Sequence, residues 1–321
     1  MGYFLGIDGG QSHTTALIAD AHGRIVGTGH AGESNHTRAP GGRERLANAI
    51  NQSVSAALEQ AGLLKNQTVA QFKFTSAYLS MTGEPEDKRA IVAELLRADV
   101  LTVEHDTRGA LAGAFAGGAG VMVMAGTGSV ACGETVDQRF VRVGGRGYLF
   151  ADEGSAFAIA RQAVSLAMRR ADRVKGQDAF QAALLKHFKR VSIEAIIEDV
   201  YANVISRERL ASFAAKVAAL AERKETTAKA IMDAAAADLA ELAEATATRL
   251  ALDKPFNVSY SGGVFKSRRL FAGFKASLAQ RVPYATVVAP RFGPDFGALL
   301  LAYRQAGKSL TPTLLKNLSG N

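Results

Sequence analysis

The residues best suited to chemistry stand in a short turn near the start of the chain. Two apolar runs, residues 3–7 and 15–19, flank a turn of glycines and hydroxyl side chains that follows Asp8. Glycine lets backbone amides approach phosphate oxygens, Ser12 and Thr14 can add hydroxyl donors, and Asp8 leaves a carboxylate where a hydrated Mg²⁺ could sit. The pattern suits the phosphate tail of a nucleotide, and it is equally compatible with a plain hairpin turn.

The same pattern returns in the middle of the chain. An apolar run from Gly120 enters the turn 126–129, a second run continues to Val136, and a third follows at 139–143. This repetition indicates an internal duplication of the hairpin unit, and two such loops would make a phosphate clamp. Cys132 falls within a predicted strand of this unit, where we expect a small buried hydrophobe rather than a reactive thiol.

Carboxylates stand at two junctions between predicted elements. Asp106 follows the apolar strand 100–103, and ligands of open α/β sheets gather beyond the carboxyl ends of strands. Capping of the next helix is the alternative role for Asp106. Asp152 and Glu153 precede a helix that starts near Ser155, where helix capping is again the alternative, although it does not explain the glycines just before them.

The elements that would position these residues alternate between strands and helices. A third strand is expected at 23–30, and a polar loop at 31–42 is too long and too glycine-rich to be a simple connection. Apolar residues at helical spacing predict a helix from Arg43 to Ala61, at positions Leu46, Ile50, Val54, Ala57 and Leu58.

The remaining predictions follow the same reasoning. We expect strands at 72–81, 257–261 and 285–289, helices at 85–96 and 295–302, and an alanine-rich helical region at 156–252. In the last helix of that region one face should be buried, at Ile231, Ala235, Leu239, Ala243, Ala247 and Leu250. The pair Gly262-Gly263 at a strand end would let a flat ring or a ribose lie against the backbone.

Composition limits the class of protein. With 321 residues, 48% hydrophobic and 21% charged, the chain is long enough for two domains of an ordinary soluble α/β protein. The net charge of +8 comes from scattered basic residues, which favours a small anion such as ATP over nucleic acid. A single cysteine excludes an internal disulfide and a Cys-rich metal site, and no signal peptide or run of eighteen apolar residues is found. We therefore expect a cytoplasmic protein that binds neither membrane nor nucleic acid.

Taken in order, the motifs resemble those of the sugar kinase, Hsp70 and actin superfamily. Asp8-Gly9-Gly10, Asp106, Gly126-Thr127-Gly128-Ser129 and Ser261-Gly262-Gly263 are similar to its phosphate-1, connect, phosphate-2 and adenosine motifs. Within it, the segments 34–36, 144–147 and 152–155 resemble the N-acetylglucosamine kinase branch, which groups with the BadF/BadG/BcrA/BcrD ATPases. The similarity spans Gly6 to Ala302.

The resemblance implies an α/β fold of two ribonuclease-H-like (actin-like ATPase) domains around a central cleft. We expect an N-terminal domain at 1–110, on the sugar and phosphate side, and a C-terminal domain at 111–321 with a helical insertion, on the nucleotide side. The last helix is expected to pack back on the N-terminal domain. Closure around the sugar would exclude water and limit idle ATP hydrolysis.

The resemblance also implies roles for individual residues. Asp106 would be the general base, and Asp8 would organise Mg²⁺ through water. The nucleotide phosphates would be held by Gly9, Gly10, Gln11, Ser12, Thr14, Gly126, Thr127 and Gly128. The adenosine would lie on Gly262, Gly263 and Lys266. The sugar would contact Asn35, His36, Asp106, Thr127, Gly144, Gly145, Asp152 and Ala156.

The expected function is an ATP- and Mg²⁺-dependent kinase of an amino sugar, N-acetylglucosamine or glucosamine, acting at the 6-hydroxyl, and the expected assembly is a homodimer. Four positions depart from the acetamido-sugar pattern or weaken it, namely Arg146, Ala151, His105 and Val130. Arg146 could stack like an aromatic plane or recognise an anionic group. The alternatives are a non-catalytic ATP- and sugar-binding regulator, or a BadF-type ATPase of another pathway.

Overall fold

The computed structural model describes residues 2–35, 37–65, 67–173 and 179–320. The chain forms two compact units, which are described separately. Unit 1 comprises the chain up to Ala119 together with the segment from Ala289 onward, and unit 2 is Gly120–Val288. The division therefore follows Ala119, whereas the sequence analysis placed it after residue 110.

Unit 1 is built on a mixed sheet with the strand order β3-β2-β1-β4-β5. The first three strands form an antiparallel meander, and β4 and β5 add in parallel beside β1. The strands are β1 (Tyr3–Gly9), β2 (Thr14–Asp20), β3 (Ile25–Ala31), β4 (Lys73–Met81) and β5 (Arg97–His105). Because β1, β4 and β5 are parallel, their carboxyl ends meet at one edge of the sheet.

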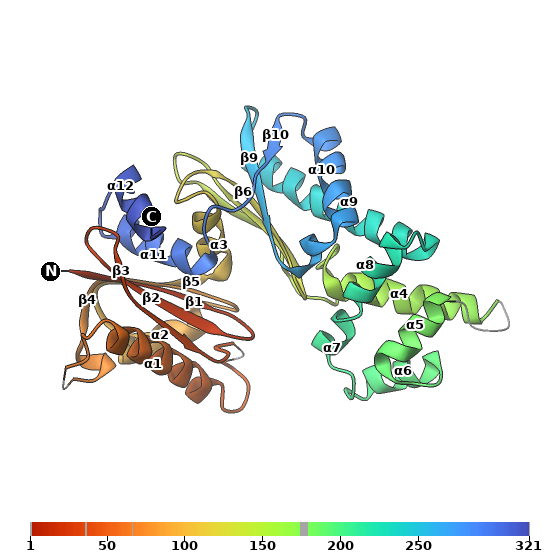
Figure 1. The fold of residues 1–321 in the computed structure, drawn as a ribbon, viewed down its shortest axis with the longest axis horizontal. Coiled ribbons are helices and arrows are strands. Elements are labelled where there is room, and N and C mark those ends of the chain that lie inside the picture. Colours follow the sequence, from red (N-terminus) through yellow and green to blue (C-terminus); the bar gives the residue numbers. More distant parts are fainter. Residues whose placement is uncertain (1, 36, 66, 174–178, 321) are drawn as a thin grey trace. The chain divides into compact units, whose positions relative to one another are not determined.

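Helices cover both faces of this sheet (Figure 1). On one face lie α1 (Gly42–Gln60) and α2 (Glu86–Leu95), and on the other lie α3 (Asp106–Ala114) and α11 (Pro294–Gln305). The shorter elements are η1 (Val69–Gln71) and α12 (Pro312–Leu318). The apolar positions that predicted α1 are buried, so its periodicity identified the correct face.

The helices α3 and α11 touch through glycine. A Cβ atom at Gly297 would lie 1.8 Å from the carbonyl oxygen of Gly109, a distance that no side chain can accept. Gly113 would meet the carbonyl of Gly293 at 2.3 Å in the same way. This close crossing brings the first turns of both helices to the edge where β1, β4 and β5 end.

Unit 2 repeats the topology of unit 1. Its sheet has the order β10-β9-β6-β7-β8, so β6 to β10 take the places of β1 to β5. The strands are β6 (Gly120–Ala125), β7 (Ser129–Glu134), β8 (Phe140–Gly144), β9 (Phe256–Ser261) and β10 (Ala285–Val287). The internal duplication seen in the sequence thus extends to the whole sheet, and Cys132 is fully buried within it.

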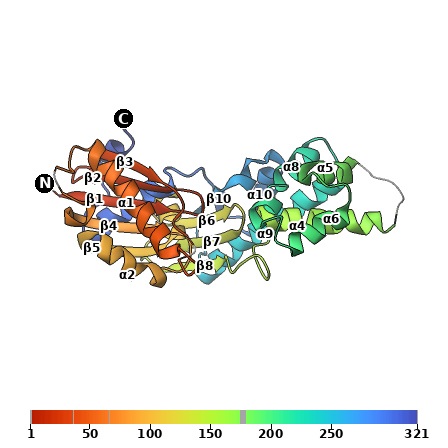
Figure 2. The same ribbon diagram turned by 90° about the horizontal axis from the view of Figure 1, so that it is seen from below.

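The helices of unit 2 lie between β8 and β10 in the sequence. They are α4 (Ala156–Ala171), α5 (Ala179–Phe188), α6 (Ile193–Tyr201), α7 (Arg207–Ala211), α8 (Ala214–Glu222), α9 (Thr226–Arg249), η2 (Gly263–Lys266) and α10 (Arg268–Arg281). Figures 1 and 2 show α4, α5, α6 and α8 gathered beyond one end of the sheet. The predicted buried face of α9 is buried at all six of its positions.

Several boundaries differ from the sequence expectation. β5 spans nine residues rather than four, because it continues across its exposed residues beside β4. The short helix η2 ends at Lys266, and α10 begins separately after the Ser267 cap. The sequence analysis also missed α12, which Thr311 caps and which packs on the core of unit 1. Among the described helices, none is long and apolar enough to cross a membrane.

Candidate functional site

Three acidic side chains of unit 1 influence one another at the sheet edge. Asp8 lies near the end of β1, Asp106 begins α3 and Asp295 lies in the first turn of α11. Burial and then the charges of Asp106 and Asp295 raise the pKa of Asp8 from its usual 3.8 to about 7. A carboxyl group in this state favours a positive charge beside it, because a cation relieves the repulsion between the acids.

A hydrogen bond orients Asp106. The hydroxyl of Thr82, just after β4, donates to Oδ2 of Asp106 at 2.8 Å. The amide of Thr82 donates to the carbonyl of Gly9 at 2.8 Å, so one residue links the first glycine turn to this carboxylate. His105, and not Asp106, occupies the N-cap position of α3, and no side chain caps that helix. The capping alternative therefore does not account for Asp106.

A buried lysine supports the same turn. Lys88, which is 1% exposed, donates from Nζ to the carbonyl of Thr82 at 2.7 Å. Burial lowers the pKa of Lys88, while the nearby acids Asp87, Asp106 and Glu84 oppose that effect. Lys88 thus fixes the backbone of Thr82, whose hydroxyl donates to Asp106.

The first glycine turn is joined to the loop that follows β3. Gln11 and Ser12 are exposed in the turn, whereas Thr14 is fully buried and donates its hydroxyl to the carbonyl of Gly32 at 2.9 Å. The Thr14 hydroxyl therefore supports the loop and does not face solvent. The amide of Ser34 donates to the carbonyl of Gly10 at 3.2 Å, which places the 34–35 segment against the turn.

Asn35 in this loop has an unsatisfied polar atom. The residue is 4% exposed, and its Oδ1 atom is buried without a hydrogen-bond partner, as is the Ser34 hydroxyl. Buried polar atoms without partners are costly in a folded protein, so an unpaired acceptor at a loop marks a place for a ligand donor. The neighbouring His36 lies outside the described residues.

The second glycine turn, Gly126 to Gly128, is tied to the start of α4. The amides of Ala156 and Phe157 donate to the carbonyls of Gly126 at 2.9 Å and of Thr127 at 3.3 Å. The helix itself begins after Ser155, whose hydroxyl accepts from the amide of Ala158. Ser155 is therefore the cap, so the two acids before it are available for other roles.

Asp152 lies behind the second turn. It is the one non-glycine residue of the 152–155 segment whose backbone is left-handed (φ 66°). Its side chain is 5% exposed. A Cβ atom on Gly128 would lie 2.7 Å from Oδ2 of Asp152, so glycine is required for the carboxylate to reach the turn. Gly144 ends β8, and Ser129 joins the next residue to this segment: its carbonyl accepts from the Gly145 amide, and its hydroxyl donates to the carbonyl of Glu153. Arg146 is exposed.

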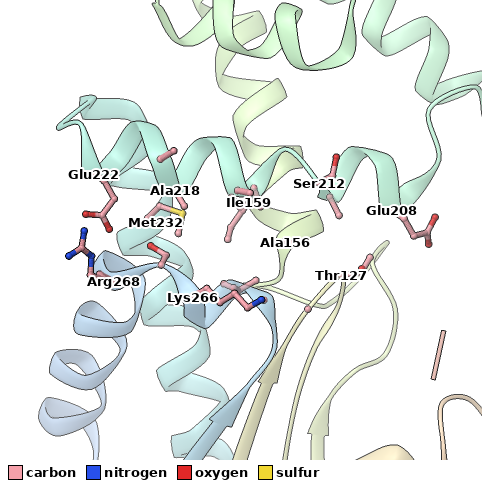
Figure 3. Close-up of a pocket in the computed structure, with 18 residues that line it drawn as sticks. Thr127, Ala156, Ile159, Glu208, Ser212, Ala218, Glu222, Met232, Lys266 and Arg268 are labelled. Carbon is pink, nitrogen blue, oxygen red and sulfur yellow. The ribbon is translucent and has the colours of Figure 1, made fainter. Parts of the chain in front are cut away.

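A cavity of about 620 Å³ opens beside the second turn. Gly126, Thr127 and Ala156 form one part of its wall, and Gly263 and Lys266 form another. The rest is mainly apolar and comes from α4, α7, α8 and α9, at Ile159, Ala211, Ala214, Ala215, Ala218 and Met232. Figure 3 shows Lys266 and Arg268 facing Ser212, Ala218 and Glu222 across the cavity. Its size and apolar lining suit a flat heterocycle, with polar groups at its ends.

Gly262 lies at the base of this cavity wall. It has a φ of 101°, and a Cβ atom there would lie 2.2 Å from the carbonyl oxygen of Ala125. Only glycine allows β9 and β6 to approach so closely before η2 begins. The two glycines of the predicted adenosine motif therefore have different roles. Gly262 permits the close approach of two strands, and Gly263 lines the cavity.

Some of these residues were not expected from the sequence. The α7–α8 wall was missed, although its alanines at 211, 214, 215 and 218 recur at helical spacing and indicate a flat, small-residue face. Asp295 was assigned only to a helix start, yet its charge helps to raise the pKa of Asp8. Ala156 was expected at the sugar, and the structure places it in the wall of the cavity with Gly126 and Thr127.

The carboxylates of unit 1 suit Mg²⁺ as a partner of phosphate oxygens. Within the described ranges, no three His, Cys, Asp or Glu side chains are grouped so that they could hold a metal ion directly. Mg²⁺ usually keeps several waters and binds through one or two carboxylates together with substrate phosphates. The partly buried Asp8 matches that requirement.

Two sheets of identical strand order, each with a glycine turn after its first strand, define an actin-like ATPase fold. A crystal structure of a Chromobacterium violaceum protein that has been proposed to be an N-acetylglucosamine kinase shares this fold, with a TM-score of 0.75 and 24% identity, over 94% of this chain and 99% of that one. The chain belongs to the BadF/BadG/BcrA/BcrD ATPase family, whose sequence profile matches residues 5–302.

Two curated relatives are sugar kinases. The N-acetylmuramic acid/N-acetylglucosamine kinase of Clostridium acetobutylicum is 25% identical over 94% of this chain and 98% of its own length. The glucosamine kinase GspK of Vibrio cholerae is 28% identical over 61% of this chain and 65% of its own length.

Proposed function

We propose that this protein is an ATP-dependent kinase that transfers the γ-phosphoryl group to the 6-hydroxyl of an amino sugar, N-acetylglucosamine or glucosamine. The observation that carries the proposal is the orientation of Asp106. Its carboxylate is fixed by Thr82 at the sheet edge that also bears the first glycine turn. A base beside a phosphate loop is the arrangement that phosphoryl transfer to a hydroxyl requires.

In the proposed reaction Asp106 takes the proton of the sugar hydroxyl. The freed oxygen forms a bond to the γ-phosphorus, the bond from that phosphorus to the β–γ bridging oxygen breaks, and ADP leaves. Thr82 occupies Oδ2 of Asp106, which leaves Oδ1 to receive the proton. Lys88 supports this arrangement, because its Nζ donates to the carbonyl of Thr82.

We expect each glycine turn to bind phosphate oxygens through its backbone amides. The amides of Gly9, Gly10, Gly126, Thr127 and Gly128 are the candidate donors, with the exposed Gln11 and Ser12 beside the first turn. Asp8 would hold Mg²⁺ through water, and the ion would neutralise the charge that develops on the phosphates. The base and ribose of ATP would occupy the 620 Å³ cavity, against Gly263 and Lys266.

In each unit, one residue expected at the sugar has a buried acceptor without a hydrogen-bond partner. These acceptors are Oδ1 of Asn35 in unit 1 and Oδ1 of Asp152 in unit 2. A sugar hydroxyl or amide N–H would satisfy each of them, whereas an apolar ligand would leave both unpaired. This requirement, together with the kinase activity of the relatives, favours a polyhydroxylated substrate over an acyl group.

The test is an ADP-release assay with Mg²⁺-ATP and a panel of N-acetylglucosamine, glucosamine, N-acetylmannosamine, N-acetylmuramic acid and glucose. We expect release that depends on one or both of the first two sugars, with a 6-phosphate identified by ³¹P NMR. ATP binding without release on any sugar would contradict the proposal and favour a non-catalytic regulator.

A further inference from the structure

The helix α7 contacts both binding regions of unit 2. Two of its residues, Glu208 and Ala211, line the nucleoside cavity, as does Ser212 just after it. Its first residue, Arg207, instead reaches Asp152, with Nη2 at 3.4 Å from Oδ2. A five-residue helix of the insertion therefore touches the cavity and the expected sugar carboxylate at once.

The guanidinium of Arg207 is held on two sides. Its Cζ atom lies 4.8 Å from the centre of the Tyr148 ring, and that ring packs edge-on against Phe157 at 4.9 Å. Nη2 of Arg207 would lie 3.2 Å from a Cβ atom on Gly128, so the group also borders the second glycine turn. Stacking on an aromatic ring fixes the plane of a guanidinium and with it the direction of its N–H donors.

The two oxygens of Asp152 consequently differ. Oδ2 faces Arg207, whereas Oδ1 is buried and has no hydrogen-bond partner. We propose that Arg207 is a positioning residue, which turns Asp152 so that Oδ1 accepts a hydrogen bond from a sugar hydroxyl. This inference rests on the proposed function and assigns a role there to the helical insertion.

The charges around Asp152 give the inference a signature in pH. The pKa of Asp152 is raised above its usual value, because burial raises it and the charge of Glu153 adds to that rise, while the charge of Arg207 opposes it. Asp238 and Glu241 line the same small cavity as Asp152 and add negative charge. Without Arg207 the pKa of Asp152 should rise further, so the carboxylate would become protonated, and the sugar acceptor lost, at a higher pH than in the wild type.

The experiment compares three variants of the full chain. Arg207→Met removes the charge and keeps most of the packing, and Arg207→Lys restores a charge without the planar group. Arg209→Met is the matched control, because Arg209 lies on the same helix and contacts the His187 carbonyl and the Phe188 ring instead. For each we would measure kcat and KM for sugar and for ATP from pH 5 to 8.

We expect Arg207→Met to raise KM for the sugar by about 10- to 100-fold, with KM for ATP within about twofold of the wild type. The acidic limb of kcat/KM for sugar should move to higher pH, and Arg207→Lys should restore part of both effects. Arg209→Met should change neither.

Three results would overturn the inference. An unchanged acidic limb in Arg207→Met, with a raised KM for sugar, would make Arg207 a merely structural residue. Equal losses for sugar and ATP would do the same. If Arg207→Met does not fold, a wild-type pH profile and KM in Arg207→Lys would count against the planar contact. A wild-type enzyme that turns over none of the sugars would instead refute the proposed function, and this inference with it.

Discussion

The two units share one backbone plan and carry opposite chemistry at corresponding positions. In each unit we compare the residue pair that lies one step before the turn of the first hairpin. In unit 1 this pair is Asp8 and Thr15, and in unit 2 it is Met124 and Val130. Unit 1 gathers acids beyond its strands, whereas unit 2 gathers alanines and other apolar residues around a cavity. The two units thus share a sheet and a glycine turn but differ in the side chains around that turn, and the proposed function assigns proton and metal chemistry to unit 1 and nucleoside binding to unit 2.

The comparison also shows why the insertion belongs to unit 2. Among the described residues, the segment between the third and fourth strands contains α1 and η1 in unit 1, whereas in unit 2 it contains α4 to α9. The extra helices build the wall of the cavity and deliver Arg207 to Asp152. The acidic half needs no such addition, because α3 and α11 already bring Asp106 and Asp295 to Asp8.

After the loss of the base itself, the largest effect should follow from removing Asp8, whose counterpart in unit 2 is Met124. Asp8→Asn should lower kcat by roughly 10²–10³-fold, because the carboxylate that would hold hydrated Mg²⁺ is lost. Steady-state kinetics over a range of Mg²⁺ concentrations is the measurement. Asp253→Asn, an exposed acid in unit 2, is the control, and a similar loss in both variants would contradict the division of roles.

The same residue should make the stability of the metal-free protein depend on pH. The folded pKa of Asp8 lies above its usual 3.8, at about 7, so its contribution to stability is present below about pH 4 and is lost as pH rises through 7. Asp8→Asn removes this loss and should be more stable than the wild type at pH 8 by on the order of 2–4 kcal/mol, with little difference near pH 4.

Thermal melts of both proteins in a chelator, between pH 4 and 8, test this expectation. Because every other group titrates in both proteins, the difference between them isolates Asp8. A gap between the two curves that does not widen with pH would show that neither burial nor the charges of Asp106 and Asp295 raise the pKa of Asp8.

A smaller effect is expected from filling the apolar cavity of unit 2. Ala215→Leu adds side-chain volume to the nucleoside cavity and should raise KM for ATP about tenfold, with kcat nearly unchanged. Ala234→Leu places the same substitution on an exposed position of α9 and should leave KM for ATP as it is. Equal KM values for ATP in the two variants would mean that the cavity does not hold the nucleoside.

The smallest effect should come from loosening the base in unit 1. Thr82→Val removes the hydroxyl that donates to Asp106, and we expect kcat to fall by about 5- to 10-fold, since one hydrogen bond to a charged group is lost. Thr82→Ser keeps the donor and should retain most of the activity. If both variants behave alike, the hydroxyl does not orient the base.

Local patterns in the sequence predicted the sheets well. Alternating apolar runs and glycine turns identified both hairpins and their duplication, because strand pairing depends on residues close in the chain. The position of α11 in unit 1 was suggested by the family resemblance, and the glycines at 109, 113 and 297 explain why it packs there. The length of β5 could not be predicted, because its exposed residues gain order only from β4.

The candidate site divides in the same way. Asp8, Asp106 and the glycine turns could be found because their residue types and spacing are distinctive. Arg207, Thr82 and Asp295 could not be found in this way. An arginine among 38 basic residues, or a threonine after a strand, belongs to no distinctive sequence motif. Two of these roles depend on contacts between residues far apart in the sequence. Arg207 contacts Asp152 at a separation of 55 residues, and Thr82 contacts Asp106 at a separation of 24 residues.

The proposed function requires that Asp106 acts as the base and that the cavity of unit 2 binds ATP without help from Asp106. The most direct test measures two quantities in one preparation of Asp106→Asn: kcat with the preferred sugar, and the Kd for ATP by calorimetry. We predict a loss of about 10²–10⁴-fold in kcat with a Kd within about twofold of the wild type. Near-normal turnover in this variant, with Asp99→Asn as the surface control, would contradict the account.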